Sequence, residues 1–347
     1  MIATLFNRAK SAAAASELRA RLFFCVASSL TALALSGCSG STGVSAKPDD
    51  AAKSVRRSDA FQSAASRGAL LVAGSNAGAI VVSTDSGKIW QRHELAQPSS
   101  IIALTACPNG TFAALDFYQK VWIGDSGGKQ WIPHAITSPI TPLGITCDGR
   151  GQLWVVGSNT IVLSSADLGV TWKSFTLNED AILRTVQFLD DQHGVISGEF
   201  GLILTTQDGG VSWQKQQKIP NDFYPYAAYF TDAQNGWLAG LAGTMLHTSD
   251  GGKNWIAQEN KSGASVYTLL GQGSDLYGLG DGSHVMVLRD GRWVAHDKLP
   301  AAPAFISAGS LVSAETLFAV GAGGELTILD LAAKRITVAL DKKKRQP

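Results

Sequence analysis

The stretch TSDGGKNW, residues 248–255, recurs along the chain with few changes. Related copies are STDSGKIW (83–90), GDSGGKQW (124–131), SADLGVTW (165–172), TQDGGVSW (206–213) and the shorter RDGRW (289–293). The aspartates that align are Asp85, Asp125, Asp167, Asp208, Asp250 and Asp290, and Asp330 continues the spacing without Gly or Trp. Because these aspartates recur at a nearly constant spacing, the chain contains seven repeats.

Each repeat contains four short β-rich runs separated by Gly and Asp turns, as in YAAYFTD, GWLAG, TMLHTS and WIAQEN of the fifth repeat. Four strands per repeat of about 40 residues is typical of a β-propeller blade. The sequence therefore predicts an all-β fold, a seven-bladed propeller over residues 59–340, in which blades pack face to face. Because the first and last repeats both carry four strands, the way the ring closes stays open.

The recurring motif is predicted to have a structural role. An Asp at the start of a tight turn accepts backbone N–H groups, and the following Gly adopts a positive φ with little strain. The Trp at the start of the outer strand is expected to pack its ring into the blade. The tryptophans at this position are Trp90, Trp131, Trp172, Trp213, Trp255 and Trp293. The repeat places these acids on the rim of the propeller, far from one another, and no reaction needs similar acids so far apart.

The first 37 residues differ from the rest. Basic residues precede the apolar stretch LFFCVASSLTALAL (22–35), which is short for a membrane span and is typical of an export signal. It ends in LSGC, which resembles the lipobox of bacterial lipoproteins and implies acylation of Cys38. The alternative is an ordinary secretory signal. Acylation would anchor the protein to a membrane facing the periplasm, and Ser39 resembles the outer-membrane sorting pattern if the source is Gram-negative.

Two further segments flank the propeller. Residues 38–58 are small and polar and are expected to form a flexible linker behind the lipidated N-terminus. Residues 341–347, DKKKRQP, form a basic tail that we expect to be solvated. The formal charge of +1 and the charged fraction of 16% give no indication of a nucleic-acid partner.

The repeats resemble the Asp-box, or BNR repeat, of sialidases and other propellers. Repeats 4 and 5, residues 186–213 and 227–255, resemble the photosystem II stability and assembly factor family. This resemblance implies a propeller on the lumen or periplasm side of a membrane that holds a membrane-protein subunit during assembly, without enzymatic turnover. The family's binding surface is arginine-rich, whereas only ten arginines follow Cys38 here, and Arg184 is the clear case on an expected inner strand.

The alternative function is a glycan-acting or glycan-binding propeller, such as a sialidase-like hydrolase. That site would need an arginine cluster, a Tyr nucleophile with a Glu partner, and an acid. The few glutamates fall in different repeats. No metal or other cofactor is expected, because His93, His134 and His296 occupy equivalent places on outer strands that diverge.

Two cysteines remain within the propeller. Cys107 and Cys147 occupy the same place on the inner strands of repeats 2 and 3, so a disulfide is geometrically conceivable in an oxidising periplasm, with two buried thiols as the alternative.

One face of the disc is predicted to carry the partner site. If strands alternate direction, the loops between strands 2 and 3 share a face with the links between blades. The candidates there are Phe117, Tyr118, Arg184, Glu199, Phe200, Phe223, Tyr224 and Tyr226. Exposed aromatic residues on loops of a rigid scaffold suit protein contacts, although several could instead fold down over blade ends. We therefore expect a monomeric, non-enzymatic scaffold whose client is a subunit of a membrane complex or of an envelope export system.

Overall fold

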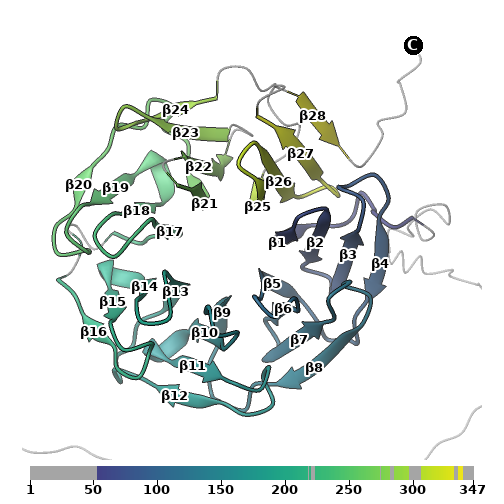
Figure 1. Ribbon diagram of the computed structural model, residues 1–347, viewed down its shortest axis with the longest axis horizontal. Helices are drawn as coiled ribbons and strands as arrows, with labels where there is room; N and C mark the ends of the chain where they lie inside the picture. Colours follow the sequence, from purple (N-terminus) through teal and green to yellow (C-terminus); the bar gives the residue numbers. More distant parts are fainter. Residues whose placement is uncertain are drawn as a thin grey trace, which may run out of the picture. The chain divides into compact units, whose positions relative to one another are not determined.

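The computed structural model describes residues 53–217, 219, 223–273, 275–281, 285–296, 306–331 and 335–338. The expected signal peptide, Cys38 and the basic tail lie outside these ranges. The described strands form seven four-stranded antiparallel sheets arranged in a ring, in chain order from purple to yellow in Figure 1. The chain is thus an all-β, seven-bladed propeller. Within the described ranges, no helix is long and apolar enough to cross a bilayer.

Each blade takes four consecutive strands, from the axis outward. The innermost strands are β1 (Phe61–Arg67), β5 (Ile101–Ala106), β9 (Pro142–Cys147), β13 (Leu183–Phe188), β17 (Ala227–Phe230), β21 (Val266–Gln272) and β25 (Ile306–Ser313). The second strands are β2 (Leu70–Ser75), β6 (Phe112–Asp116), β10 (Leu153–Gly157), β14 (Gly194–Gly198), β18 (Gly236–Ala239), β22 (Asp275–Gly280) and β26 (Thr316–Gly321). The third strands are β3 (Ala79–Ser83), β7 (Lys120–Gly124), β11 (Val162–Ser165), β15 (Ile203–Thr206), β19 (Met245–Thr248), β23 (Val285–Arg289) and β27 (Leu326–Asp330). The outermost strands are β4 (Gln91–Glu94), β8 (Trp131–Ala135), β12 (Lys173–Phe175), β16 (Gln214–Lys215), β20 (Ile256–Ala257), β24 (Arg292–Ala295) and β28 (Arg335–Val338).

The second and third strands form the core of each blade. All residues of β3 and β6 are buried, because both faces of a middle strand are covered by neighbouring blades. Among the described residues the apolar clusters number seven, and each joins two adjacent blades; one combines Val72 and Ile80 of blade 1 with Phe112 and Trp122 of blade 2. The hydrophobic runs of the sequence therefore stabilise the seams between blades.

The ring closes by packing of blade 7 on blade 1, since each sheet is complete by itself. The Ser66 hydroxyl of β1 donates to the Leu311 carbonyl of β25 at 2.7 Å. Ala60 forms an isolated antiparallel bridge with Ala322, and Trp90 stacks on Phe318 with ring centroids 5.6 Å apart. Side-chain packing at this seam thus replaces the exchange of a strand between the terminal blades.

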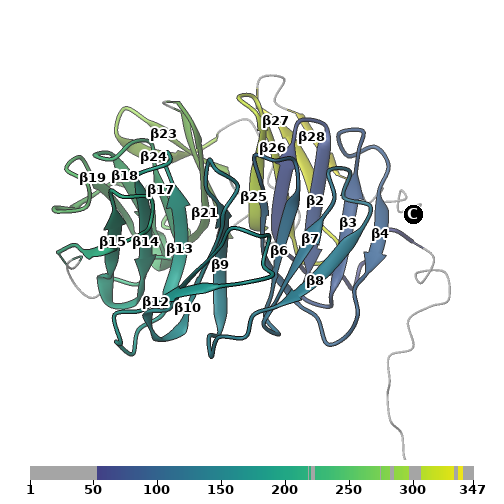
Figure 2. The same ribbon diagram turned by 60° about the horizontal axis from the view of Figure 1, so that its bottom comes forward.

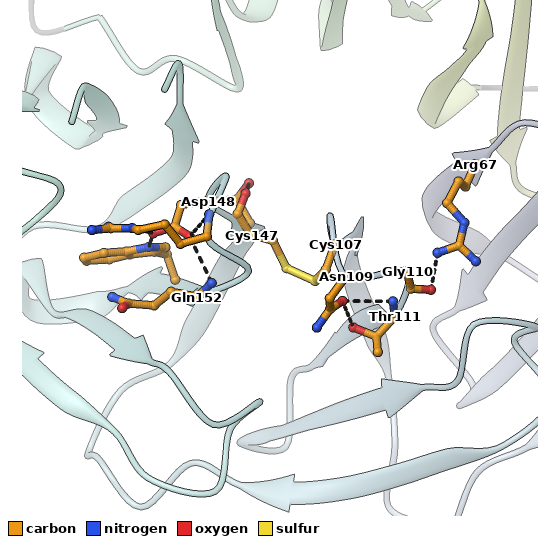
Figure 3. Close-up of a disulfide and its surroundings, with 11 residues drawn as sticks. Arg67, Cys107, Asn109, Gly110, Thr111, Cys147, Asp148 and Gln152 are labelled. Carbon is orange, nitrogen blue, oxygen red and sulfur yellow. Dashed lines mark hydrogen bonds and ion pairs between the residues drawn. A yellow bond between two sulfur atoms is a disulfide. The ribbon is translucent and has the colours of Figure 1, made fainter. Parts of the chain in front are cut away.

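A disulfide joins Cys107 and Cys147 across the seam between blades 2 and 3, with their Cα atoms 5.3 Å apart (Figure 3). Beside it, the buried Asp148 carboxylate accepts the Gln152 N–H at 2.9 Å (Figure 3). Other seams have their own polar bridge. Examples are the Gln187 amide to the Phe230 carbonyl at 2.9 Å and the Tyr229 hydroxyl to the Gly271 carbonyl at 2.7 Å.

The recurring motifs form the turns between third and fourth strands in blades 1 to 5. Asp250 Oδ1 accepts the Asn254 N–H at 2.8 Å, and Thr248 donates its hydroxyl to the same oxygen. The indole N–H of Trp90, Trp131 and Trp255 donates to a Gly carbonyl of its own motif. The indole N–H groups of Trp172 and Trp213 are buried without a partner among the described residues. The motif is therefore held by hydrogen bonds within the turn, and the indole N–H takes part in only some of its copies.

Repeat 6 departs from the expected motif. Arg289 pairs with Arg292, so Asp290 and Gly291 form a two-residue hairpin turn, with φ of +49° and +74°. Trp293 is fully buried between blades 5 and 6, and its indole N–H donates to Gln258 Oε1 at 2.9 Å. Because the turn lacks the residues that normally separate Asp from Trp, Asp290 acts as a turn residue rather than as an Asp-box acid.

The ring has two faces, which Figure 2 shows obliquely. We call one the loop face; it carries the turns between second and third strands and the links between blades. The other, the box face, carries the turns between first and second strands and the Asp-box turns. Because the strands of each blade alternate in direction, every inner strand begins at the loop face.

Candidate partner-binding face

A cluster of aromatic rings and one guanidinium lies on the loop face of blades 4 to 6. The Arg184 guanidinium lies over the Tyr226 ring, 5.4 Å from its centroid. The Tyr226 ring lies 5.3 Å from that of Tyr224 and 5.7 Å from that of Tyr267. We call Tyr224, Tyr226 and Tyr267 the tyrosine cluster. The structure thus brings Arg184 of the fourth repeat together with Tyr224 and Tyr226, which lead into the fifth.

A β-bulge explains why Arg184 reaches this cluster. Leu183 pairs with Gly198 and Thr185 with Ser197, which leaves Arg184 as the extra residue of β13. Tyr267 is likewise the extra residue of β21, between Val266 and Thr268. A bulge redirects a side chain out of the regular alternation of a strand.

The same position recurs around the axis. The extra residue is Gln62 in β1, Ile102 in β5, Leu143 in β9, Arg184 in β13, Tyr267 in β21 and Ser307 in β25. Tyr226 occupies the equivalent place just ahead of β17, and its N–H donates to the Ala239 carbonyl at 2.8 Å. We call these seven residues the bulge ring. Tyr267, Ile102 and Leu143 were missed by sequence reasoning, although each lies one repeat length from its neighbours in the ring, a spacing that is visible in the sequence.

Glu199 fixes the turn beside the cluster. It belongs to the turn η2 (Glu199–Gly201), and its Oε2 accepts the Ile182 N–H at 2.9 Å. The Glu199 N–H in turn donates to the Ile182 carbonyl at 2.8 Å. The charge of Glu199 acts on Tyr224 together with that of Arg184, so the two charged groups and the tyrosine share one site.

Burial favours the protonated phenol in two members of the cluster, Tyr224 and Tyr267. Burial raises the pKa of Tyr224, while the nearby charge of Arg184 acts in the opposite direction. Burial also raises the pKa of Tyr267, whose hydroxyl donates to Asp281 Oδ2 at 3.1 Å. A tyrosine nucleophile would need its pKa lowered, because the phenolate is the reactive form. The cluster is therefore suited to donating hydrogen bonds and to stacking.

The other candidates split into exposed and inward-facing residues. Phe200 is half exposed, and Phe117 and Tyr118 on blade 2 are 47% and 50% exposed. Those two rings meet edge to face, and the buried Asp116 holds their loop by accepting the Tyr118 N–H at 3.0 Å. Phe223 instead packs on the core between blades 4 and 5, where a Cβ on Gly240 would overlap its ring. Phe223 thus serves as a lid, one of the two expected roles for these aromatics.

Among the described residues, no three His, Cys, Asp or Glu side chains gather closely enough to hold a metal ion. The His93 side chain is partly buried, and its Nε2 atom is buried without a hydrogen-bond partner among the described residues. Burial lowers its pKa.

The chain matches known proteins over its central repeats. A family model described as "Photosynthesis system II assembly factor YCF48" matches residues 164–287. The photosystem II assembly protein Ycf48 of Thermosynechococcus vestitus is 32% identical over 165 residues, which are 43% of this chain and 46% of that protein. The photosystem II assembly lipoprotein Ycf48 of Prochlorococcus marinus is 29% identical over 178 residues, 48% of this chain and 51% of that protein. The chain thus spans about half the length of these curated relatives.

Solved structures share the fold. YCF48 bound to a D1 peptide superposes with a TM-score of 0.54 at 20% identity, over 64% of this chain and 76% of that one. A catalytically inactive virginiamycin B lyase from Staphylococcus aureus with quinupristin superposes with a TM-score of 0.67 at 14% identity, over 78% of this chain and 94% of that one. The propeller fold therefore occurs in both binding proteins and enzymes. The central repeats of this chain are therefore similar in sequence to the photosystem II assembly factor-like family of Asp-box propellers.

Proposed function

We propose that this protein is an exported, lipid-anchored scaffold that binds a protein subunit of a membrane complex and assists its assembly or stability. The observation that carries the proposal is the stack of Arg184 on Tyr226 within the tyrosine cluster, held by bulges in two inner strands. Tyrosine and arginine are the residues that most often dominate the binding energy of protein interfaces.

The chemistry of this face fits a peptide segment. The phenols of Tyr224 and Tyr226 can donate hydrogen bonds to a partner. Among the described residues Arg184 forms no ion pair, so a partner's carboxylate or carbonyl can bind it. The exposed rings of Phe117, Tyr118 and Phe200 stand on loops fixed by hydrogen bonds, which limits the entropy lost on binding. The similarity to a propeller solved with a D1 peptide supports this class of client.

The described N-terminal segment supports a membrane-facing orientation. The Ser54 carbonyl accepts from Arg92 of β4 at 3.4 Å, and Val55 packs in the core between blades 7 and 1. The Asp59 carbonyl accepts the Gly324 N–H at 2.8 Å, in the turn between β26 and β27. The segment therefore crosses the loop-face side of the ring.

The anchor itself rests on the sequence. LSGC ahead of Ser39 has the form of a lipobox, and one relative is named a lipoprotein. Two or more acyl chains would give stable attachment, because a single chain binds a membrane only marginally. Replacement of Cys38 by Ser is expected to move the protein from the membrane to the soluble fraction of the cell envelope. Retention of the variant in washed membranes would contradict lipidation at Cys38.

We propose a non-enzymatic, monomeric scaffold rather than a glycan-acting enzyme. Burial raises the pKa of Tyr224 and Tyr267, and Glu199 uses one carboxylate oxygen to hold a backbone N–H, so neither a nucleophile nor a free acid is prepared. A sialidase-like site needs several arginines for the sugar carboxylate, whereas here Arg184 alone contacts the tyrosine cluster. Release of a fluorogenic sialoside by the purified protein, at rates above those of an Arg184→Gln variant, would favour the enzyme instead.

Site-specific cross-linking tests the proposed client. A photoreactive benzophenone side chain is placed at Leu241, which is 50% exposed on the loop face of blade 5. The matched control is Ile132, which is 58% exposed on the outermost strand of blade 2. Irradiation of intact membranes should yield a discrete protein adduct from position 241 that is missing from position 132. Equal adduct patterns at both positions, or none at either, would refute the proposal.

A further inference from the structure

One turn type recurs on the loop face of blades 3, 4 and 5. It comprises η1 (Ser158–Thr160), η2 and η4 (Leu241–Gly243). The middle residues Asn159, Phe200 and Ala242 have φ of +57°, +55° and +51°. The residues that follow them, Thr160, Gly201 and Gly243, have φ of +50°, +69° and +71°. Two successive residues of positive φ define a type I′ turn, whose first position favours Asn, Asp or Gly.

Phe200 is the least suited of the three residues to this position. Asn is tolerated in the left-handed region because of its short polar side chain, whereas a bulky side chain there is a genuine outlier. Asn159 in blade 3 therefore fits the turn, and Phe200 in blade 4 strains it. Strain of this kind persists where the surrounding structure imposes it, and it concentrates at functional sites.

The surroundings impose the turn from both sides. Glu199 binds the backbone of Ile182 through its N–H and its carboxylate. The Gly201 N–H donates to the Phe223 carbonyl at 3.0 Å, and the Gly201 carbonyl accepts the Ile219 N–H at 3.1 Å. Packing of the Phe200 ring offsets little of the strain energy, because half of the side chain remains exposed. Folding alone would favour Asn at this position.

We infer that Phe200 is an affinity-determining anchor whose ring inserts into an apolar pocket of the protein client. This inference rests on the proposed function and adds the chemistry of the contact. Phe200 lies in the same turn as Glu199, next to the tyrosine cluster, so the client must present an apolar side-chain pocket beside groups that accept hydrogen bonds. A rigidly held aromatic ring loses little conformational entropy when it is buried.

The experiment measures thermal stability and adduct formation on the same variants of the full chain. Phe200→Asn creates the favoured Asn-Gly turn, so its Tm should rise by about 2 °C. Phe200→Ala removes the ring but keeps a side chain at positive φ, so its Tm should change little. Both variants should lower the yield of the adduct from benzophenone at Leu241 about tenfold or more.

The matched control is Asn159→Ala at the same turn position of blade 3. Its Tm should fall, while the adduct yield stays unchanged, which separates turn stability from binding. A lower Tm for Phe200→Asn would mean that the ring stabilises the fold, and it would overturn the inference. So would full adduct yield from both Phe200 variants, and in that case the proposed function would stand. Absence of any adduct from the unaltered chain would refute the proposed function and this inference together.

Discussion

Arg184 and Tyr226 belong to different repeats of the sequence, yet the guanidinium of one lies 5.4 Å from the ring centroid of the other. Each belongs to the bulge ring, and the two side chains meet because the inner strands of adjacent blades lie side by side around the axis (Figure 1). Among the described residues no carboxylate pairs with Arg184, so its charge can bind an anionic group of a partner.

Removal of the Arg184 charge should weaken client binding without unfolding the protein. Arg184→Gln is expected to reduce the adduct from benzophenone at Leu241 about tenfold, since a desolvated charged contact contributes on the order of 1.5–3 kcal/mol. Arg289→Gln, at an exposed arginine of blade 6, serves as the control and should retain the adduct. Equal loss in both variants, or none in Arg184→Gln, would contradict a binding role for Arg184.

The Cys107–Cys147 disulfide should stabilise the seam between blades 2 and 3. It closes a loop with a sequence separation of 40 residues, for which chain entropy predicts about 4 kcal/mol at most. The double variant Cys107→Ser/Cys147→Ser should unfold roughly 5–10 °C earlier in calorimetry. Dithiothreitol should lower the Tm of the unaltered protein similarly and leave that of the double variant unchanged. An equal decrease in Tm with dithiothreitol in both proteins would mean that the decrease does not come from reduction of this disulfide.

Gly210 of the blade 4 motif should be intolerant of any side chain. It has a φ of +83°, and an added Cβ would overlap the Trp154 ring of blade 3. Gly210→Ala should therefore destabilise the protein by about 2–5 kcal/mol, from backbone strain and overpacking combined. Gly68→Ala isolates the strain, since Gly68 has a φ of +57° and an added Cβ there would meet nothing within 4 Å. Urea denaturation giving equal losses for both variants would show that the overlap is relieved at little cost.

The Asp-box turns should make stability depend on pH in the acidic range. The Ser212 and Thr206 groups that donate to Asp208 hold its pKa at about 2, and the pKa values of Asp167 and Asp250 are about 2 for similar reasons. A carboxyl whose pKa is lower in the folded state stabilises that state above the unfolded pKa of about 3.8, and this stabilisation is lost as pH falls towards 2.

The urea concentration at the midpoint of unfolding should accordingly decrease as the pH is lowered from 4 to 2. In the triple variant Asp167→Asn/Asp208→Asn/Asp250→Asn, the slope in this range should be smaller. Some slope should remain, because the pKa of Asp190 is also about 2, owing to the His193 groups that donate to it. A slope unchanged in the triple variant would mean that these carboxyl groups do not titrate with unfolding.

Much of the fold could be predicted from local signals. The motif around Asp250 uses hydrogen bonds between residues two to four positions apart, so the residues that form the turn are close together in the sequence. Six copies at a nearly constant spacing, continued by Asp330, then indicate seven blades. The predicted Asp-box turn was wrong for repeat 6, because an Asp-Gly pair also suits a two-residue hairpin. Only the pairing of Arg289 with Arg292 in the structure distinguishes the hairpin from an Asp-box turn.

The candidate site was predictable only in part. Arg184, Tyr224 and Tyr226 stood out by residue type, but Tyr267 did not, because its role depends on a bulge that no turn residue marks. The Gly three residues before the Trp in the motifs of blades 1 to 5 showed the same limit. Its positive φ was expected, whereas the close approach of the preceding blade, such as Trp154 on Gly210, follows from packing between repeats.

The sequence by itself determined the repeat, the number of blades and the turn chemistry, because these depend on interactions within a few residues of one another. Tertiary structure decided how the ring closes, which aromatic rings fold inward and which stay exposed, and that Arg184 stacks on Tyr226. Those features depend on the curvature of the ring and on bulges that redirect single side chains, so they arise only when blades distant in the chain are packed together.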